Sequence, residues 1–162
     1  MTSASATPGP ISFDDVETKH LGFLIAVARD HMQGDLAEVG ASIGVRLGVG
    51  PLDGLRASHL RLLSLIPRTG ARLTDLVTVA GMTKQGLGQF MDVLRQLGYI
   101  TSSQDPSDRR TRILIRTSKG DRAVEATNRV YALLEERWAA AVGQDRWATF
   151  RSVLVELGHV SD

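Results

Sequence analysis

The amino-acid sequence predicts a mainly α-helical fold that contains one small β-hairpin. Apolar residues recur every three or four positions through most of the chain, which is the spacing of one helix face. Between residues 99 and 117 this spacing is lost, and two strand-like runs flank a cluster of turn-forming residues. A length of 162 residues and a hydrophobic fraction of 43% are sufficient for one domain with a substantial core.

The composition excludes several classes of protein. The absence of cysteine rules out a disulfide framework, a thiolate metal site and a cysteine redox switch, and it is compatible with a reducing cytoplasm. Residues 1–12 lack the basic start and apolar run of a signal peptide, and we expect them to form a disordered tail. No apolar stretch approaches the length of a bilayer span. We therefore expect a cytoplasmic protein with no membrane partner.

The net charge of +1 is unevenly distributed along the chain. Residues 67–122 hold 10 Lys/Arg against 5 Asp/Glu, whereas residues 1–66 hold 5 against 7 and residues 123–162 hold 4 against 6. A basic middle third between mildly acidic arms indicates a polyanionic partner for the middle third. Chance clustering of solvated arginines is the alternative.

Segment 13–54 is predicted to contain one long helix and a glycine-rich connector. Ser12 has the side chain of an N-cap, and acidic residues follow in the first turn of a helix near 13–39. Its apolar stripe consists of Leu21, Leu24, Ile25, Ala28, Met32, Leu36 and Val39. Such a long stripe needs a partner surface. The connector, 40–54, lacks the signature of a phosphate loop, and we expect a flexible lid or linker.

Three short helices follow, and each is preceded by a capping hydroxyl: Ser58 before 59–67, Thr74 before 75–80, and Thr83 before 84–97. The first of these helices is expected to bury Leu60, Leu63 and Ile66. Residues 68–72 are predicted to form a loop. Gly81 and Gly98 are predicted to end the second and third helices.

Residues 99–117 are predicted to form the hairpin, with strands at 99–103 and 110–117 and a turn at 104–109. In the second strand Ile113 and Ile115 face one way, and Arg112, Leu114 and Arg116 face the other. Lys119 and Gly120 are expected to end the hairpin. A helix is predicted from Asp121 to Gly143, and a last helix carries the apolar residues Trp147, Phe150, Val153, Leu154 and Leu157.

The helix at 84–97 has two chemically different faces. Its apolar stripe consists of Leu87, Phe90, Met91, Leu94 and Leu97. Its other face supplies the candidate DNA contacts Thr83, Lys84, Gln85, Gly88, Gln89 and Arg95. Hydroxyl, amide and cationic groups bond to base edges and phosphates. Gly86 and Gly88 each cost a helix about 1 kcal/mol against alanine, so they serve either a close approach of DNA or tight packing between two helices.

The hairpin turn supplies the remaining candidate DNA contacts, which are Asp108, Arg109, Arg110 and Arg112. A hairpin beside a helix in the major groove has its tip near the flanking minor groove, where arginine is favoured. We expect Asp108 to hold Arg110 in direction by a charge-assisted hydrogen bond, and Arg109 to be a general phosphate contact. An ordinary solvated turn is the alternative.

The residues from about Leu55 to Gly120 resemble the MarR-type winged helix-turn-helix regulators. The resemblance is carried by "LTDLVTVAGMTKQGLGQFMDVLRQLGYI", by "DPSDRR" and by "RTSKG". Asp108 and Arg110 match the Asp-x-Arg of the family's wing. Thr117 and Gly120 match most of its Leu-Thr-x-x-Gly, in which Arg116 replaces the leucine.

The resemblance implies a winged helix-turn-helix DNA-binding domain at 55–120, flanked by N- and C-terminal dimerisation helices, the latter within 121–162. It also implies a homodimer on double-stranded DNA, a recognition helix that starts near Thr83, Arg110 in the minor groove, and regulation by a small-molecule effector.

Two further sets of side chains were weighed as ligand sites. The spacings of His20, His31, His59 and His159 fit no ligand pair on a single helix, so we expect no metal and no cofactor. Trp138, Trp147 and Phe150 either line a pocket for a small aromatic effector or make core and dimer contacts, and helical spacing favours the contacts.

The leading hypothesis is a dimeric, sequence-specific transcriptional regulator, expected to be a ligand-responsive repressor that binds a palindromic operator. The alternative is a winged-helix module that binds a protein partner and no DNA, and the basic middle third argues against it. An enzyme is not expected, because the sequence offers no nucleophile–base pair, no cluster of metal ligands and no nucleotide loop.

Overall fold

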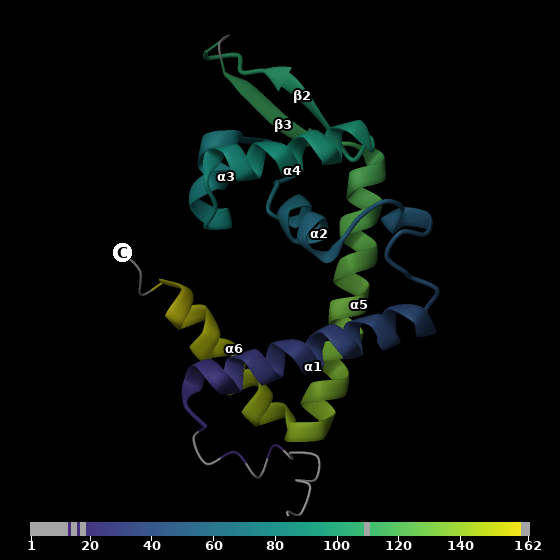
Figure 1. Ribbon diagram of the computed structural model, residues 1–162, viewed down its shortest axis with the longest axis vertical. Helices are drawn as coiled ribbons and strands as arrows, with labels where there is room; N and C mark the ends of the chain where they lie inside the picture. The colour runs from purple at the N-terminus through teal and green to yellow at the C-terminus, as the bar shows by residue number, and fades with distance from the viewer. Residues whose placement is uncertain (1–12, 14–15, 17–18, 109–110, 160–162) are drawn as a thin grey trace, which may run out of the picture. The chain divides into compact units, whose positions relative to one another are not determined.

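The structure is a computed structural model and describes residues 13, 16, 19–108 and 111–159. It confirms the predicted fold class, since the described chain is mainly helical with one small sheet (Figure 1). The elements are α1 (Leu21–Ser42), the 3-10 turn η2 (Gly50–Leu52), α2 (Ala57–Ser64), β1 (Ala71–Arg72), α3 (Leu73–Ala80), α4 (Lys84–Gln96), β2 (Ile100–Gln104), β3 (Arg112–Arg116), α5 (Ser118–Val142) and α6 (Gln144–His159). The tail expected at 1–12 lies outside the described residues.

The chain divides into two compact units, residues 1–35 and residues 36–162. The second unit holds the core, which is built from α2, α3, α4, the sheet and the first turns of α5. The expected burial of Leu60, Leu63 and Ile66 is confirmed, because their exposed fractions are 6%, 0% and 0%. Burial of apolar surface on this scale is the main force that holds these short helices together.

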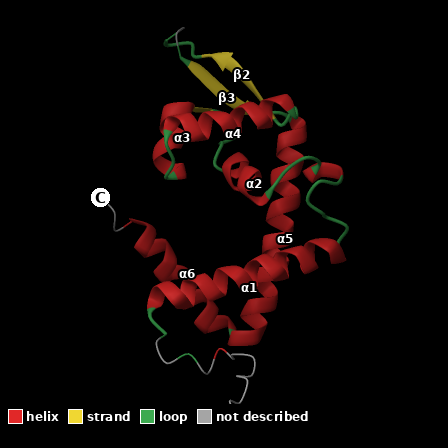
Figure 2. Ribbon diagram, viewed as in Figure 1, coloured by secondary structure: helices red, strands yellow, loops and turns green. Residues whose placement is uncertain are grey.

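The sheet has three antiparallel strands in the order β1-β3-β2 (Figure 2). The hairpin that the change of period predicted is present, with Ile100 paired to Arg116. Gln104, which was expected in the turn, is instead the last residue of β2 and pairs with Arg112. The loop predicted at 68–72 is wrong in its second half. Ala71 and Arg72 form β1 and pair with Leu114 and Ile113, and a strand of two residues is too short to show a period in the sequence.

Two of the predicted N-caps are wrong. α2 begins two residues earlier than expected, with Arg56 as its N-cap and Ser58 inside the helix. α3 has Arg72 as its N-cap, and Thr74 lies in its first turn. At the start of α2 the Nδ1 of His59 accepts the Arg56 N–H at 3.1 Å, and α3 directly follows β1, so in neither case does the nearby hydroxyl mark the first residue of the helix.

The predicted ends of α4 are confirmed. The hydroxyl of Thr83 accepts a hydrogen bond from the Gly86 N–H at 3.2 Å, which is an N-cap. At the other end Gly98 has φ +75, and the Gly98 and Tyr99 N–H groups donate to the carbonyls of Arg95 and Leu94 at 3.0 and 2.9 Å. This pair of bonds is a Schellman motif, which requires the left-handed conformation that glycine adopts without strain.

The first helix starts later than predicted. α1 begins at Leu21 and not near residue 13, and the cap expected at Ser12 lies outside the described residues. The Nδ1 of His20 accepts a hydrogen bond from the Phe23 N–H at 3.2 Å and thereby caps the helix start. The predicted apolar stripe of α1 is largely exposed, with Leu21 at 67% and Ile25 at 55%.

α6 also exposes apolar side chains. They are Phe150, Val153, Leu154, Val155 and Leu157, with exposed fractions between 45% and 60%. α6 packs against α5, where Trp138 meets Trp147 edge to face with ring centroids 5.7 Å apart. Contiguous exposed apolar surface of this kind is typical of an interaction surface.

The connector expected to be flexible is instead packed. Leu52 and Leu55 are 4% and 3% exposed and belong to the core. The hydroxyl of Tyr99 donates a hydrogen bond to the Asp53 carbonyl, which joins the connector to the residue that follows α4. The glycines therefore permit tight turns between anchored residues, and the stretch is a fixed connection and not a loose linker.

The boundary predicted between hairpin and last helices is also wrong. Thr117 is the N-cap of α5, so Lys119 and Gly120 lie in the first turn of that helix. The Thr117 hydroxyl accepts from the Gly120 N–H at 3.2 Å and donates to the Gly98 carbonyl at 2.8 Å. A Cβ atom on Gly120 would lie 2.2 Å from the carbonyl oxygen of Tyr99. Glycine is required here because the two backbones approach so closely.

The surroundings of Gly120 and Gly88 predict opposite effects of Gly→Ala changes on the free energy of unfolding. Gly120→Ala should lower the free energy of unfolding by about 1–3 kcal/mol, because backbone has to shift to admit the methyl group. Gly88→Ala, in the middle of α4, should raise it by up to about 1 kcal/mol, since a Cβ there meets nothing within 4 Å. Denaturant unfolding of both variants at one protein concentration measures the two changes. A tolerated Gly120→Ala would contradict the close approach.

Candidate nucleic-acid interface

α3 and α4 form a helix-turn-helix, and α4 separates buried from exposed side chains. Gly81 ends α3 in the left-handed conformation, and Thr83 starts α4 two residues later. The inner face of α4 is fixed in the core by Leu87, Met91 and Leu94, which are at most 4% exposed. Lys84, Gln85 and Gln89 are exposed. The structure thus presents on one surface the polar groups that the sequence assigned to DNA contact.

The two glycines of α4 differ in their surroundings. A Cβ on Gly86 would lie 3.2 Å from the capping hydroxyl of Thr83, so this glycine leaves room for the cap. A Cβ on Gly88 would meet nothing within 4 Å. Tight packing between two helices, one of the two explanations offered for these glycines, is therefore wrong for Gly88.

His59 of α2 packs against α4. Its ring lies edge to face against the ring of Phe90 of α4, with centroids 5.2 Å apart. Its Nδ1 accepts a hydrogen bond from the Arg56 N–H at 3.1 Å. Burial, with a smaller contribution from the Arg56 charge, lowers the pKa of His59, which favours the neutral ring that this acceptor role requires.

Arg95 is not gathered with the other predicted DNA contacts. It lies twelve residues beyond Thr83, which is about 18 Å along a helix axis. Its guanidinium is bonded to Asp92 of the same helix at 2.6 Å. Arg112, by contrast, is exposed at the start of β3 and lies 3.5 Å from the hydroxyl of Ser102 on the neighbouring strand.

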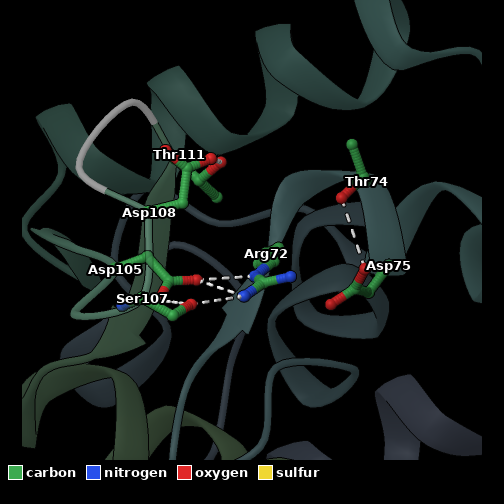
Figure 3. Close-up of polar contacts among 7 residues, drawn as sticks. All are labelled: Arg72, Thr74, Asp75, Asp105, Ser107, Asp108 and Thr111. Atoms are coloured by element: carbon green, nitrogen blue, oxygen red, sulfur yellow. Dashed lines mark hydrogen bonds and ion pairs between the residues drawn. The ribbon is translucent and has the colours of Figure 1, made fainter.

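At the hairpin turn, a buried carboxylate is surrounded by hydrogen-bond donors. Asp105 is 4% exposed. Its Oδ1 accepts from the N–H and the hydroxyl of Ser107 at 2.8 and 2.7 Å, and its Oδ2 accepts from the Nε of Arg72 at 2.7 Å. A second nitrogen of Arg72 donates to the Ser107 hydroxyl at 3.2 Å (Figure 3). We call Arg72, Asp105 and Ser107 the wing anchor.

The wing anchor changes the acidity of its carboxyl group. The hydrogen bonds from Ser107, with a further contribution from Arg72, lower the pKa of Asp105 to about 2. Bonds to the charged form stabilise it against protonation. Since the folded pKa is below its ordinary value, the anchor is complete at neutral pH and is lost only as the pH falls toward 2.

The turn itself is described at both ends. The Thr111 N–H donates to the Asp108 carbonyl at 2.9 Å, and the Thr111 hydroxyl donates to the Asp108 carboxylate at 2.8 Å. Arg109 and Arg110, and with them the predicted Asp108–Arg110 bond, lie outside the described residues.

At the base of the hairpin, Arg116 departs from the family's Leu-Thr-x-x-Gly pattern and forms an ion pair. Arg116 stands where the family has leucine, and its side chain is only 9% exposed. Its guanidinium lies 3.0 Å from the carboxylate of Asp121, in the first turn of α5. The charge is thus paired where a leucine would be packed.

The described histidines receive no support from the geometry as a metal site. Within the described part of the chain, no three His, Cys, Asp or Glu side chains gather as metal ligands. His20 and His59 each use Nδ1 to accept a backbone N–H at a helix start. Trp138 and Trp147 are half-buried at the α5–α6 contact, whereas Phe150 is 47% exposed. None of the described helices is both long and apolar enough to span a membrane.

Sequence reasoning missed Arg72, Asp105 and Ser107 as site residues. Asp-x-Ser at 105–107 is a signal for a turn in which the carboxylate accepts the second following N–H, and this bond is present. The partner Arg72 lies 33 positions away, and nothing in the local sequence indicates that pairing.

Comparison with known proteins places the fold. No protein-family model and no curated protein matches the chain. Solved structures do match it. The transcriptional repressor CouR bound to a 23-mer DNA duplex is 25% identical, with a TM-score of 0.65, over 86% of this chain and 92% of that one.

Two further structures agree with this result. CouR from Rhodococcus jostii RHA1 bound to p-coumaroyl-CoA is 18% identical, with a TM-score of 0.66, over 88% of this chain and 94% of that one. A MarR-family transcriptional regulator from Rhodococcus sp. RHA1 is 17% identical, with a TM-score of 0.67, over 89% of this chain and 100% of that one. The chain therefore has the fold of the MarR-type winged helix-turn-helix regulators, as its sequence resemblance predicted.

Proposed function

We propose that this protein is a sequence-specific, DNA-binding transcriptional regulator. The observation that carries the proposal is the polar face of α4, where Lys84, Gln85 and Gln89 are exposed while the opposite face is fixed in the core. A rigidly held helix with amide and cationic side chains suits the major groove. The similarity to CouR, solved with a DNA duplex, supports the same use of the fold.

The proposal includes a homodimer and a palindromic operator. The exposed apolar side chains of α1 and α6 need cover, and a second copy of the chain supplies it through the same helices. Two-fold symmetry of the protein then requires two half-sites, about one helical turn apart. The domain boundaries assigned from the sequence, 13–54, 55–120 and 121–162, remain part of this proposal.

The proposal also includes a cytoplasmic repressor that responds to a small aromatic effector. CouR is a repressor and has been solved with p-coumaroyl-CoA, whose acyl group is aromatic. The aromatic side chains Trp138, Trp147 and Phe150 at the α5–α6 contact are candidates for effector contact. We propose no enzymatic activity, since the structural relatives above are regulators.

Selection of bound sequences from random duplex DNA tests the proposed function. We expect an imperfect palindrome, protected over both half-sites, with an affinity that falls steeply as salt rises because phosphate contacts release counterions. Protection of one asymmetric half-site by a single chain would contradict the dimer. Weak binding with no sequence preference and little salt dependence would favour the protein-binding alternative.

Gln85 and Lys84 are expected to differ in kind. Loss of Gln85, by Gln85→Ala, should relax base preference at one position of each half-site by about 1–3 kcal/mol, because an amide can bond bidentately to adenine. Lys84→Ala should weaken all sequences alike and reduce the salt slope. Titrations of the selected duplex and its single-base variants, at two salt concentrations, measure both. The reverse assignment would show that α4 is rotated from the proposed orientation.

A further inference from the structure

The hydrogen-bonding ladder of the sheet leaves the hairpin turn unsupported. The β2–β3 ladder ends at the pair Gln104 and Arg112, and β1 pairs only with residues 113 and 114. Residues 105–108 and Thr111 therefore lie beyond all three strands, where the Asp105 N–H donates to the Thr111 carbonyl at 2.9 Å. Main-chain bonds of this hairpin do not connect its tip to the helix-turn-helix.

The wing anchor supplies that connection. The backbone of Arg72 belongs to β1 and caps α3, and its guanidinium reaches Asp105 and Ser107 in the turn (Figure 3). One side chain thus joins the first helix of the helix-turn-helix to the tip of the wing. A planar guanidinium that bonds at two points fixes direction as well as distance.

The chemistry of the anchor is that of a positioned group and not of a solvated surface pair. The side chain of Asp105 is 5% exposed and that of its partner Arg72 is 46% exposed, whereas in the exposed ion pair Arg68–Glu125 both side chains are more than 60% exposed. Both carboxylate oxygens are satisfied by donors. A buried charge with complete partners has one favoured arrangement, since any other leaves it unpaired.

We infer that Arg72, Asp105 and Ser107 are positioning residues, which set the direction of the wing relative to α4 and so determine how the protein discriminates the DNA that flanks its operator. This inference rests on the proposed function. Asp105 has no direct attraction to DNA, because its carboxylate is negative and buried. Its effect is exerted through the residues that follow Ser107 in the chain, among which Arg110 is the predicted minor-groove contact.

For the variant Asp105→Asn, the inference predicts a loss of flank discrimination, whereas its change of charge alone predicts tighter binding to DNA. Asp105→Asn makes the protein more positive, so simple electrostatics predicts tighter binding to every duplex. An amide has one acceptor oxygen and an NH2 group that only donates, so if its oxygen faces the Ser107 donors, its NH2 group faces the guanidinium of Arg72, and the reverse orientation leaves the Ser107 N–H unpaired. The wing then loses its direction. We expect the preference for A·T-rich over G·C-rich flanks to fall to within about twofold of that of Arg110→Ala, the reference for a lost wing contact.

The experiment uses the full-length protein and duplexes that share one selected core and differ only in the flanks. The measured quantity, the flank ratio, is the dissociation constant for the G·C-flanked duplex divided by that for the A·T-flanked duplex. Thermal unfolding of each variant checks that it is folded. A role confined to stability lowers binding to both duplexes alike and leaves the ratio unchanged. Ser107→Ala changes no charge at an exposed residue and should lower the ratio partly. If Asp105→Asn does not fold, the flank ratio of Ser107→Ala tests the inference in its place.

Two matched controls make the same substitutions outside the wing anchor, and they show whether the effect depends on where the residue lies. Arg72→Ala removes the guanidinium of the wing anchor and should lower the flank ratio. Arg68→Ala removes the same charge, but from an exposed pair with Glu125, and should leave the flank ratio unchanged. Ser103→Ala makes the same substitution as Ser107→Ala on exposed β2 and should also leave it unchanged. Arg72→Lys keeps the charge but not the two-point bond, and should behave like Asp105→Asn.

The outcomes separate this inference from the proposed function. A wild-type protein that selects no sequence overturns both. A wild-type protein that binds its operator without flank preference overturns the inference alone. The inference is also wrong if folded Asp105→Asn, or Ser107→Ala where Asp105→Asn fails to fold, keeps the wild-type ratio. A lowered ratio in these variants, with both controls unchanged, supports it.

Discussion

The contact between the end of α4 and the start of α5 is the constraint on which the arrangement of α4, β2 and α5 depends. Three consecutive carbonyls, those of Leu97, Gly98 and Tyr99, accept bonds from the Lys119 ammonium and the Thr117 hydroxyl. Gly120 allows the approach, because any side chain there would overlap the Tyr99 carbonyl. A helix, a strand and a second helix therefore diverge from one point, and their relative directions are fixed together.

The same junction also holds the connector that follows α1. The Lys119 ammonium lies 4.2 Å from the centre of the Tyr99 ring, and the Tyr99 hydroxyl bonds to the Asp53 carbonyl. A cation at the C-terminal end of α4 is further stabilised by the dipole of that helix. Any displacement of α5 along this contact must move the end of α4 or break these bonds. These bonds thus connect the position of α5 to that of α4, the helix proposed to read DNA.

Local signals in the sequence predicted what local bonds determine. Thr83 caps α4 and Gly98 ends it, as expected, because the partners of both residues lie within five positions along the chain. The hairpin followed from its change of period. The predictions failed where a distant residue decides the structure. Thr74 is not a cap because α3 follows β1, and β1 exists only because β3 lies beside it.

The candidate site divides in the same way. The polar face of α4 was predictable, since one helical period separates it from the buried stripe. The wing anchor was not, because Arg72 and Asp105 are distant in sequence and meet only when β1 is in place. The bonds from Ser107 that lower the pKa of Asp105 have a local signal, the Asp-x-Ser at 105–107, whereas its bond to Arg72 has none.

The central claim is that the first turns of α4 and the anchored wing form one DNA-contacting surface. Amide hydrogen exchange of the full-length protein, with and without its selected duplex, tests this claim most directly. The account predicts slower exchange at residues 84–89 and 105–112, and unchanged exchange along residues 150–157 of α6. Protection confined to α6 or α1, with the amides of α4 unaffected, would contradict it.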